Sequence, residues 1–183
     1  MTNRTVVLMS GGIDSTACAS FLLQHGNSVT GFFVDHGQKA AIPETQSVSK
    51  VSSFLNIPLE TVTMKLGAKF GTGELIGRNA LLVFTAIMAL QLRSGTIALG
   101  IHSGTAYYDC TVPFLETTNR LVAEYTDGQM ELIAPFIEWS KKDVFEQFKA
   151  SGVPIELTYS CEGGQVPACG TCLSCRDRRI LGC

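Results

Sequence analysis

The chain has 183 residues, of which 45% are hydrophobic and 16% are charged, and its formal net charge is −2. This composition is typical of a globular domain with a substantial core, and it excludes an intrinsically disordered chain. The small net charge also argues against a strongly basic surface for nucleic acid.

Apolar runs alternate with amphipathic ones from the N-terminus to about residue 152. The patterns predict, in chain order, a strand Thr5–Met9, a helix Ser15–His25, a strand Ser28–Asp35, a helix Pro43–Leu55, a strand Leu59–Met64, a loop Gly67–Gly77, a helix Arg78–Arg93, a strand Thr96–Ile101, a helix Thr111–Tyr125, a strand Glu131–Phe136 and a helix capped by Ser140 that stops at Gly152. The segment from Pro154 onward is rich in glycine and cysteine.

The alternation of strands and helices predicts an α/β fold, because strands without a period of two fit a parallel sheet covered on both faces. We therefore expect one doubly wound domain, residues 1–183, with residues 158–183 as a metal-binding segment. The start of the chain lacks an apolar stretch long enough for a signal peptide. Residues 80–92 are apolar but too short to span a bilayer, so we expect a cytoplasmic protein without a membrane contact.

The segment MSGGIDSTAC, Met9–Cys18, lies between the first predicted strand and the first predicted helix. Gly11 and Gly12 let backbone N–H groups approach an anion, and the helix N-terminus adds N–H donors and partial positive charge. These features predict a phosphate-binding loop, although the lysine-bearing loop G-x-x-x-x-G-K-[ST] is absent. Asp14 suits this site if Mg²⁺ lies between the carboxylate and the phosphate. The alternative is a glycine turn followed by a helix cap.

Four of the seven cysteines are spaced C-x7-C-x2-C-x2-C, namely Cys161, Cys169, Cys172 and Cys175. Without an export signal, metal ligation is expected in preference to disulfides. Four thiolates complete a tetrahedral site, so we predict a structural Zn²⁺ site that ties the C-terminal segment to the domain. An iron–sulfur cluster and incidental reduced cysteines are the alternatives.

SGGIDS resembles the SGG-x-DS loop of the N-type ATP pyrophosphatases, or PP-loop enzymes. Further motifs follow along the chain in this order: DHGQ, GRN, YYDC, PFIEWSKKDV and the cysteine spacing. With these motifs, nearly the whole chain resembles the 7-cyano-7-deazaguanine synthases of the queuosine pathway. The resemblance implies the adenine nucleotide alpha hydrolase-like fold, with ATP, Mg²⁺ and Zn²⁺ as cofactors. It also implies an ATP-dependent ligase that forms C–N bonds.

In that family the carboxylate of 7-carboxy-7-deazaguanine is adenylated and pyrophosphate leaves. Ammonia then gives an amide, and a second ATP leads to the nitrile. The substrates implied are therefore the carboxylated deazaguanine and ammonia, with no nucleic acid, and related synthases are often homodimers. The nucleotide-binding residues implied are Met9, Ser10, Gly11, Gly12, Ile13, Asp14, Ser15, Thr16, Ala17 and Cys18, together with Asp35.

The catalytic residues implied by the resemblance are Asp14, Ser15, Arg78 and Lys141. Lys141 matches a PP-loop lysine that could neutralise charge on the phosphates, whereas a solvated lysine is the alternative. Arg78 could pair with a carboxylate or phosphate, or could simply support the start of a helix. For substrate binding, Asp109 could accept hydrogen bonds from the base edge, and Tyr108 could stack on the base or pack in the core. His36 is either a proton carrier or a packed residue.

Three departures from the family pattern affect the half of the site that faces the acceptor. The segment before Arg78 is short, Thr111 stands where arginine is expected, and no helix is expected after the cysteines. A shorter lid would suit an acceptor larger than ammonia, such as an amine of a partner protein in a bacterial antiviral defence system. A nucleotide-binding partner without turnover and a tRNA sulfur-transfer enzyme are the remaining alternatives.

Overall fold

The five predicted strands form one parallel sheet in the order β3-β2-β1-β4-β5. The strands are β1 (Arg4–Leu8), β2 (Ser28–Asp35), β3 (Leu59–Thr63), β4 (Gly95–Ala98) and β5 (Met130–Ile133). The computed structural model describes residues 4–64, 66 and 73–183, so most of the predicted loop Gly67–Gly77 lies outside the described residues. The predicted doubly wound α/β fold is confirmed.

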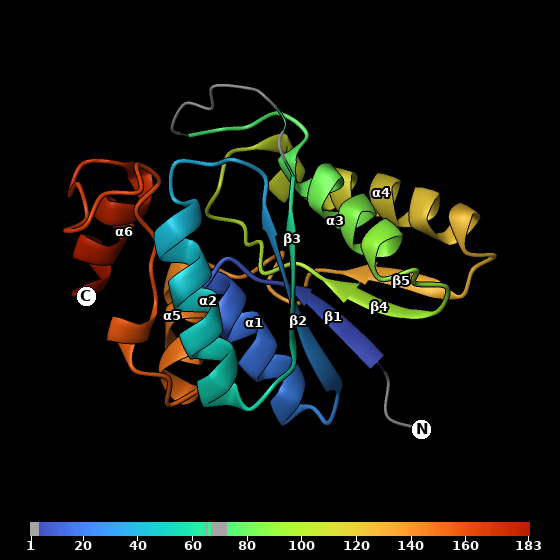
Figure 1. The fold of residues 1–183 in the computed structure, drawn as a ribbon, viewed down its shortest axis with the longest axis horizontal. Coiled ribbons are helices and arrows are strands. Elements are labelled where there is room, and N and C mark those ends of the chain that lie inside the picture. The colour runs from blue at the N-terminus through green and yellow to red at the C-terminus, as the bar shows by residue number, and fades with distance from the viewer. Residues whose placement is uncertain (1–3, 65, 67–72) are drawn as a thin grey trace.

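Helices cover both faces of this sheet (Figure 1). One face carries α1 (Ile13–Gln24), α2 (Ala41–Leu55) and α5 (Lys141–Ala150), and the other carries α3 (Arg78–Ala89) and α4 (Val112–Tyr125). Two short 3-10 helices, η1 (Tyr108–Cys110) and η2 (Ile155–Leu157), and a C-terminal helix, α6 (Leu173–Leu181), complete the fold. Among the described residues, no helix combines the length and the apolar character needed to cross a membrane.

The core lies in two layers because successive residues of a strand point to opposite faces of the sheet. Val7 and Phe33 pack in the layer formed with α1, α2 and α5, whereas Val6 and Phe32 pack in the layer formed with α3 and α4. All four side chains are at most 3% exposed. This burial on both faces explains why the strands have continuous apolar sequences without polar alternation.

Several element ends differ from those predicted, each for a local reason. β5 ends at Ile133, before Pro135, which has no N–H to donate to a sheet. α3 ends at Ala89, and Gln91 follows in the left-handed conformation with φ of 49°. The expectation of no helix after the cysteines was wrong, since α6 begins within the cysteine segment and runs to Leu181. Ser140 does cap α5, accepting from the Asp143 N–H in a capping box.

Candidate active site

The candidate site lies where the strand order reverses. β1 is hydrogen-bonded to β2 on one side and to β4 on the other, and in such sheets ligands bind outside the carboxyl ends of the strands at this point. The segment after β1 carries the predicted phosphate loop, and the segment after β4 carries His102. These two segments and the start of α5 bring together side chains from three separate parts of the chain.

The phosphate loop is held in one shape by its own hydroxyl groups and by a close backbone contact. Gly11 has φ of +72°, and a Cβ there would lie 2.6 Å from the backbone nitrogen of Val48, so only glycine fits. Ser15 Oγ accepts from the Ser10 N–H (3.3 Å) and donates to Gly12 O (3.3 Å). Thr16 Oγ1 also donates to Gly12 O (2.7 Å). The loop therefore precedes the α1 N-terminus in a preorganised conformation.

Asp14, in the first turn of α1, is the charged centre of the site. Lys141 Nζ lies 2.6 Å from its Oδ1 and 2.7 Å from its Oδ2. His102 Nε2 lies 3.8 Å from Asp14 Oδ2. The side chains of Lys141 and Asp14 remain 24% and 33% exposed, so a ligand can reach the pair. Two of the predicted catalytic residues thus lie in direct contact.

His102 is a site residue that the sequence analysis missed. Its Nδ1 accepts a hydrogen bond from the Gly104 N–H (3.0 Å), which places the ring proton on Nε2, the nitrogen that faces Asp14. Burial lowers the pKa of His102; the carboxylate of Asp14 opposes this shift and the ammonium of Lys141 adds to it. The available signal was a polar residue directly after a buried strand, at the edge of the sheet that carries the site.

The side chains of the remaining residues of the predicted nucleotide-binding segment are buried in the core. Met9 and Ile13 are each 3% exposed, and Thr16, Ala17 and Cys18 are fully buried. Burial raises the pKa of Cys18 to about 12, which keeps it a neutral thiol. Any contact of these residues with a phosphate group therefore comes from the backbone.

A second polar group lies at the carboxyl end of β2. Asp35 Oδ1 accepts from the Gly37 N–H (2.9 Å), and Gln38 donates to Glu44 Oε2 (2.7 Å) and accepts from the His36 N–H (2.9 Å). His36 is 6% exposed, and its pKa is lowered by burial and then by the positive charge of Arg78. Burial raises the pKa of Glu44, and Arg78 opposes this shift. Arg78 is therefore near enough to the end of β2 for its positive charge to act on both groups.

Asp109 fixes the start of α3, the helix that begins at Arg78. Its Oδ2 accepts from the Asn79 N–H (3.1 Å), its backbone carbonyl accepts from Asn79 Nδ2 (2.8 Å), and it is 6% exposed. Tyr108, in contrast, is 59% exposed and contacts Phe114 edge-on. Thr111, where the resemblance led us to expect arginine, caps α4 by accepting from the Phe114 N–H (3.4 Å).

The four cysteines of the predicted metal site are brought together. The Sγ atoms of Cys161, Cys169, Cys172 and Cys175 all lie within 4.8 Å of one another, and the sulfurs of Cys169 and Cys175 are 3.9 Å apart. A tetrahedral zinc site with Zn–S bonds of about 2.3 Å has its sulfurs about 3.8 Å apart. The cluster can therefore hold a metal ion.

The backbone around this cluster also suits bound thiolates. Gly170, with φ of +72°, turns the chain so that the Thr171 and Cys172 N–H groups both donate to Cys169 Sγ at 3.4 Å. Hydrogen bonds from the Thr171 hydroxyl and from these two amides lower the pKa of the Cys169 thiol to about 5. A lowered thiol pKa favours the thiolate form that a metal requires.

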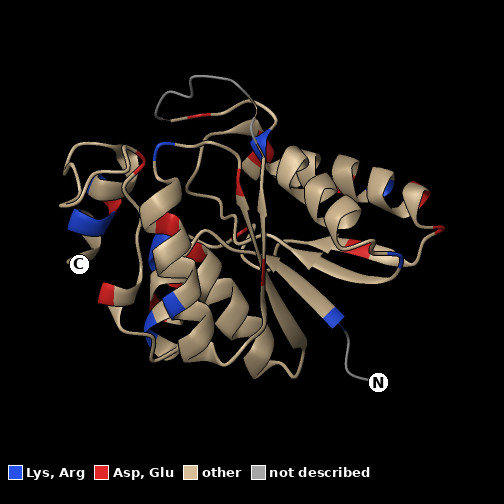
Figure 2. Ribbon diagram, viewed as in Figure 1, with Lys and Arg blue, Asp and Glu red and all other residues tan. Residues whose placement is uncertain are grey.

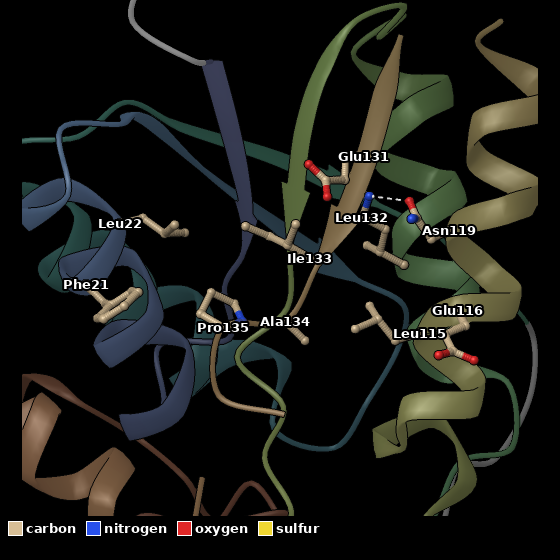
Figure 3. A pocket seen from close by; sticks show the side chains of 10 residues that line it. All are labelled: Phe21, Leu22, Leu115, Glu116, Asn119, Glu131, Leu132, Ile133, Ala134 and Pro135. Atoms are coloured by element: carbon tan, nitrogen blue, oxygen red, sulfur yellow. Dashed lines mark hydrogen bonds between the residues drawn. The ribbon is translucent and has the colours of Figure 1, made fainter. Parts of the chain in front are cut away.

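A groove of about 480 Å³ lies elsewhere, along the outer edge of β5. Figure 3 shows Phe21 and Leu22 of α1 on one side, Leu115 and Glu116 of α4 on the other, and Pro135 between them. None of the residues that line it belongs to the phosphate loop or to the Asp14 cluster. The groove is therefore separate from the candidate active site.

Nearly the whole chain matches one known protein family. The model of the family described as "Queuosine biosynthesis protein QueC" matches residues 4–80 and 75–180. The 7-cyano-7-deazaguanine synthase of Methanoculleus marisnigri is 32% identical over 205 residues, which cover 96% of this chain and 92% of that protein. The 7-cyano-7-deazaguanine synthase 1 of Desulfitobacterium hafniense is 30% identical over 199 residues, which cover 96% and 90%.

Solved structures share the fold at much lower identity. The NMN synthetase of Francisella tularensis superposes with a TM-score of 0.62 at 18% identity, covering 99% of this chain and 78% of that one. The U34-tRNA thiolase NcsA of Methanococcus maripaludis, solved with its [4Fe-4S] cluster, superposes with a TM-score of 0.59 at 14% identity, covering 97% and 64%. At these identities the likeness concerns the fold alone.

Proposed function

Since the chain belongs to the QueC family of queuosine biosynthesis proteins, we propose that it adenylates the carboxylate of 7-carboxy-7-deazaguanine with ATP and releases pyrophosphate. Amidation by ammonia follows, and dehydration then gives 7-cyano-7-deazaguanine. The chain is thus an ATP-dependent ligase that forms C–N bonds. The observation that carries the proposal is the contact of Lys141 with Asp14 directly after a preorganised glycine loop.

The phosphate loop would bind the pyrophosphate end of ATP. The backbone of Gly11 and Gly12 and the first N–H groups of α1 supply donors, and Ser10 and Ser15 hold the loop in shape. A carboxylate oxygen of the substrate attacks the α-phosphate, and the pyrophosphate leaves. The ammonium of Lys141 neutralises the negative charge that grows on this leaving group. AMP is later displaced from the acyl carbon by the nitrogen nucleophile.

Magnesium fits the oxygen donors of this site. Asp14 supplies a partly exposed carboxylate at the start of α1, and Mg²⁺ is usually bound by one or two carboxylates together with phosphate oxygens. We propose that Asp14 holds the ion, which would supply positive charge to the phosphates of ATP. We assign Zn²⁺ to the four thiolates, where it would stabilise the C-terminal segment and take no part in the reaction.

The acceptor half of the site would be formed by residues near the ends of β2 and β4. Arg78 is proposed to pair with the substrate carboxylate or with a phosphate, and Asp35 to contact the nucleotide. Tyr108 is proposed to stack on the deazaguanine from its exposed position, and Asp109 to accept hydrogen bonds from the base edge. Asp109 also positions Arg78, because its carboxylate holds the first turn of α3.

A second candidate function differs only in the acceptor. The exposed Tyr108 and the short segment before Arg78 favour an open acceptor side, on which an amine of a partner protein could attack the acyl-adenylate in an antiviral system. Association of the chain as a homodimer is compatible with either reaction. Both functions share the adenylation step, and they differ in the nitrogen nucleophile, which is ammonia in the first and an amine of a partner protein in the second.

The test is incubation of the purified protein with ATP, Mg²⁺ and 7-carboxy-7-deazaguanine, with and without ammonium. Pyrophosphate release and small-molecule products are followed together, the latter by mass spectrometry. Nitrile at catalytic turnover, with a second ATP consumed per product, supports the synthase reaction. Pyrophosphate release that stalls at the adenylate would support the protein acceptor. Absence of pyrophosphate release, with an Asp14→Ala variant behaving as the wild type, would refute both.

A further inference from the structure

The helix α6 contains Cys175 and is capped at its N-terminus by Cys172, and it also carries an arginine, Arg178, that reaches toward the phosphate loop. Cys172, Cys175 and Arg178 follow one another at intervals of three residues and lie on one face of α6. Several residues of this helix are basic (Figure 2). Metal binding at Cys172 and Cys175 would therefore fix the direction in which Arg178 points.

Arg178 reaches the loop through the segment 158–160. Its Nε donates to Ser160 Oγ at 3.2 Å, and its Nη2 donates to Thr158 Oγ1. The Tyr159 N–H, between these two residues, donates to Gly11 O at 3.0 Å. Gly12 is also close to this segment, since a Cβ added to it would lie 3.5 Å from Tyr159 O and 3.7 Å from Ser160 Oγ. The guanidinium is thus separated from the phosphate loop by one layer of residues.

The charge of Arg178 is not matched by a salt bridge within the part of the chain that the structure describes. Its side chain is half-buried, and burial lowers its pKa, while the negative groups that oppose this shift include Cys183, Cys175 and Asp14. A partly buried cation that forms no direct salt bridge is costly to a fold unless an anion completes the site. The proposed pyrophosphate site is the neighbouring place for such an anion.

We propose that Arg178 is a positioning residue for the pyrophosphate end of ATP. It holds Ser160 and Thr158 against the backbone of Gly11 and Gly12, and it adds positive charge behind the loop. The four-cysteine site then acts on nucleotide binding as well as on stability, because it orients the helix that presents Arg178. This inference rests on the proposed function, in that it assumes that the loop binds pyrophosphate.

The experiment is calorimetric titration of the full-length, metal-loaded protein with ATP and, separately, with inorganic pyrophosphate. Arg178→Gln is compared with Arg176→Gln, an exposed arginine on the same helix. Charge-assisted hydrogen bonds contribute enough that Arg178→Gln should weaken pyrophosphate binding by about 10- to 100-fold. The KM for ATP should rise more than kcat falls, and the metal content should stay that of the wild type. Arg176→Gln should match the wild type in all three measurements.

Two further variants test whether Arg178 acts through Ser160. Arg178→Lys keeps the charge but cannot hold both hydroxyl groups with one planar fork, so its affinity should lie between those of the wild type and Arg178→Gln. Ser160→Ala should weaken pyrophosphate binding, and the double variant Arg178→Gln/Ser160→Ala should lose less than the sum of the two single losses.

Unchanged pyrophosphate affinity in a metal-replete Arg178→Gln protein would overturn the inference while leaving the proposed function intact. The inference would also fail if affinity fell only in those variants, Arg178→Lys included, that had lost their metal. A wild-type protein that bound neither ATP nor pyrophosphate would instead refute the proposed function itself, and the inference with it.

Discussion

Lys141 and Asp14 stand 127 positions apart in the sequence, yet Lys141 Nζ lies within 2.7 Å of both carboxylate oxygens of Asp14. Asp14 is fixed by the first turn of α1, and Lys141 is the first residue of α5, so two helix starts meet at the edge of the sheet. The pair keeps the lysine charge beside the phosphate loop and makes a carboxylate available to a divalent cation.

Asp14→Asn should abolish most of the adenylation activity while preserving the fold. The amide has the shape of the carboxylate but cannot pair with Lys141 or bind Mg²⁺ well, so we expect kcat for pyrophosphate release to fall by about 100-fold or more. Asp127→Asn is the matched control, because Asp127 is exposed and has φ of 50°, a conformation that asparagine tolerates. Equal activity of the two variants would exclude Asp14 from the reaction.

Lys141→Gln should reduce pyrophosphate release by about 100-fold, because the leaving group would lose a positive charge placed to meet it. Lys142→Gln removes the same charge from the adjacent, exposed position of α5 and should change the rate less than twofold, since an exposed charge contributes about 1 kcal/mol or less. Steady-state rates at saturating ATP and Mg²⁺ make the comparison. If both variants lost activity equally, general electrostatics rather than the site would be responsible.

Gly11→Ala should destabilise the protein more than Gly26→Ala. Both glycines have positive φ, +72° and +77°, so both substitutions carry the backbone cost of about 1–2 kcal/mol. At Gly11 the new Cβ would lie 2.6 Å from a backbone nitrogen, that of Val48, whereas nothing lies within 4 Å at Gly26, so crowding should add about 1–3 kcal/mol at Gly11 alone. Urea unfolding measures the two free energies, and equal losses would contradict the close packing of the loop.

Stability should decline below neutral pH in part because of His102. The pKa of His102 is lowered in the folded protein, whereas in the unfolded chain it is near 6.5, so the unfolded chain binds more protons between these two values. The free energy of unfolding should therefore fall as the pH drops below about 6.5. His102→Gln should show a smaller decline, and His25→Gln, at an exposed position, should follow the wild type. Denaturation series at several pH values would reveal parallel curves if His102 had no such role.

Metal loss should loosen the C-terminal segment. Cys172→Ser should lose the bound ion and lower Tm, by about 2–4 °C for each kcal/mol of stability lost, whereas Cys183→Ser, at an exposed cysteine outside the cluster, should retain both. Elemental analysis gives the metal content. One zinc per chain is expected, and equal amounts of iron and inorganic sulfide would show that the zinc assignment was wrong.

The sequence was sufficient for the elements whose apolar pattern is strong. The bounds predicted for β2, Ser28–Asp35, match the structure, because its apolar residues lie between two clear turn signals, Gly26-Asn27 before the strand and Gly37 after it. The helix α6 was missed, since LSCRDRRIL is short and has few apolar residues. Its start is set by long-range contacts instead, with Glu162 Oε1 accepting from the Ser174 N–H (3.1 Å) and hydroxyl (3.0 Å).

The site residues also fall into two groups, those that a local sequence pattern predicts and those that only the folded chain brings together. The glycine loop and the cysteine spacing are local patterns, so they could be read directly from the residues. The place of His102 beside Asp14 depends on β4 pairing with β1, a contact between strands that are not consecutive in the chain. The position of Arg178 near the phosphate loop depends on how the cysteine segment folds against that loop. Neither neighbour can be inferred from spacing alone.

The edge of the sheet beside the groove in Figure 3 has a consequence for solubility. The Leu132 N–H of the outermost strand β5 donates to Asn119 Oδ1 of α4 at 2.8 Å. An exposed strand edge is a template onto which another chain can add, and a side chain that occupies its donors removes part of that template. Asn119→Ala would expose this donor, and the protein should then form β-rich aggregates more readily during expression and heating.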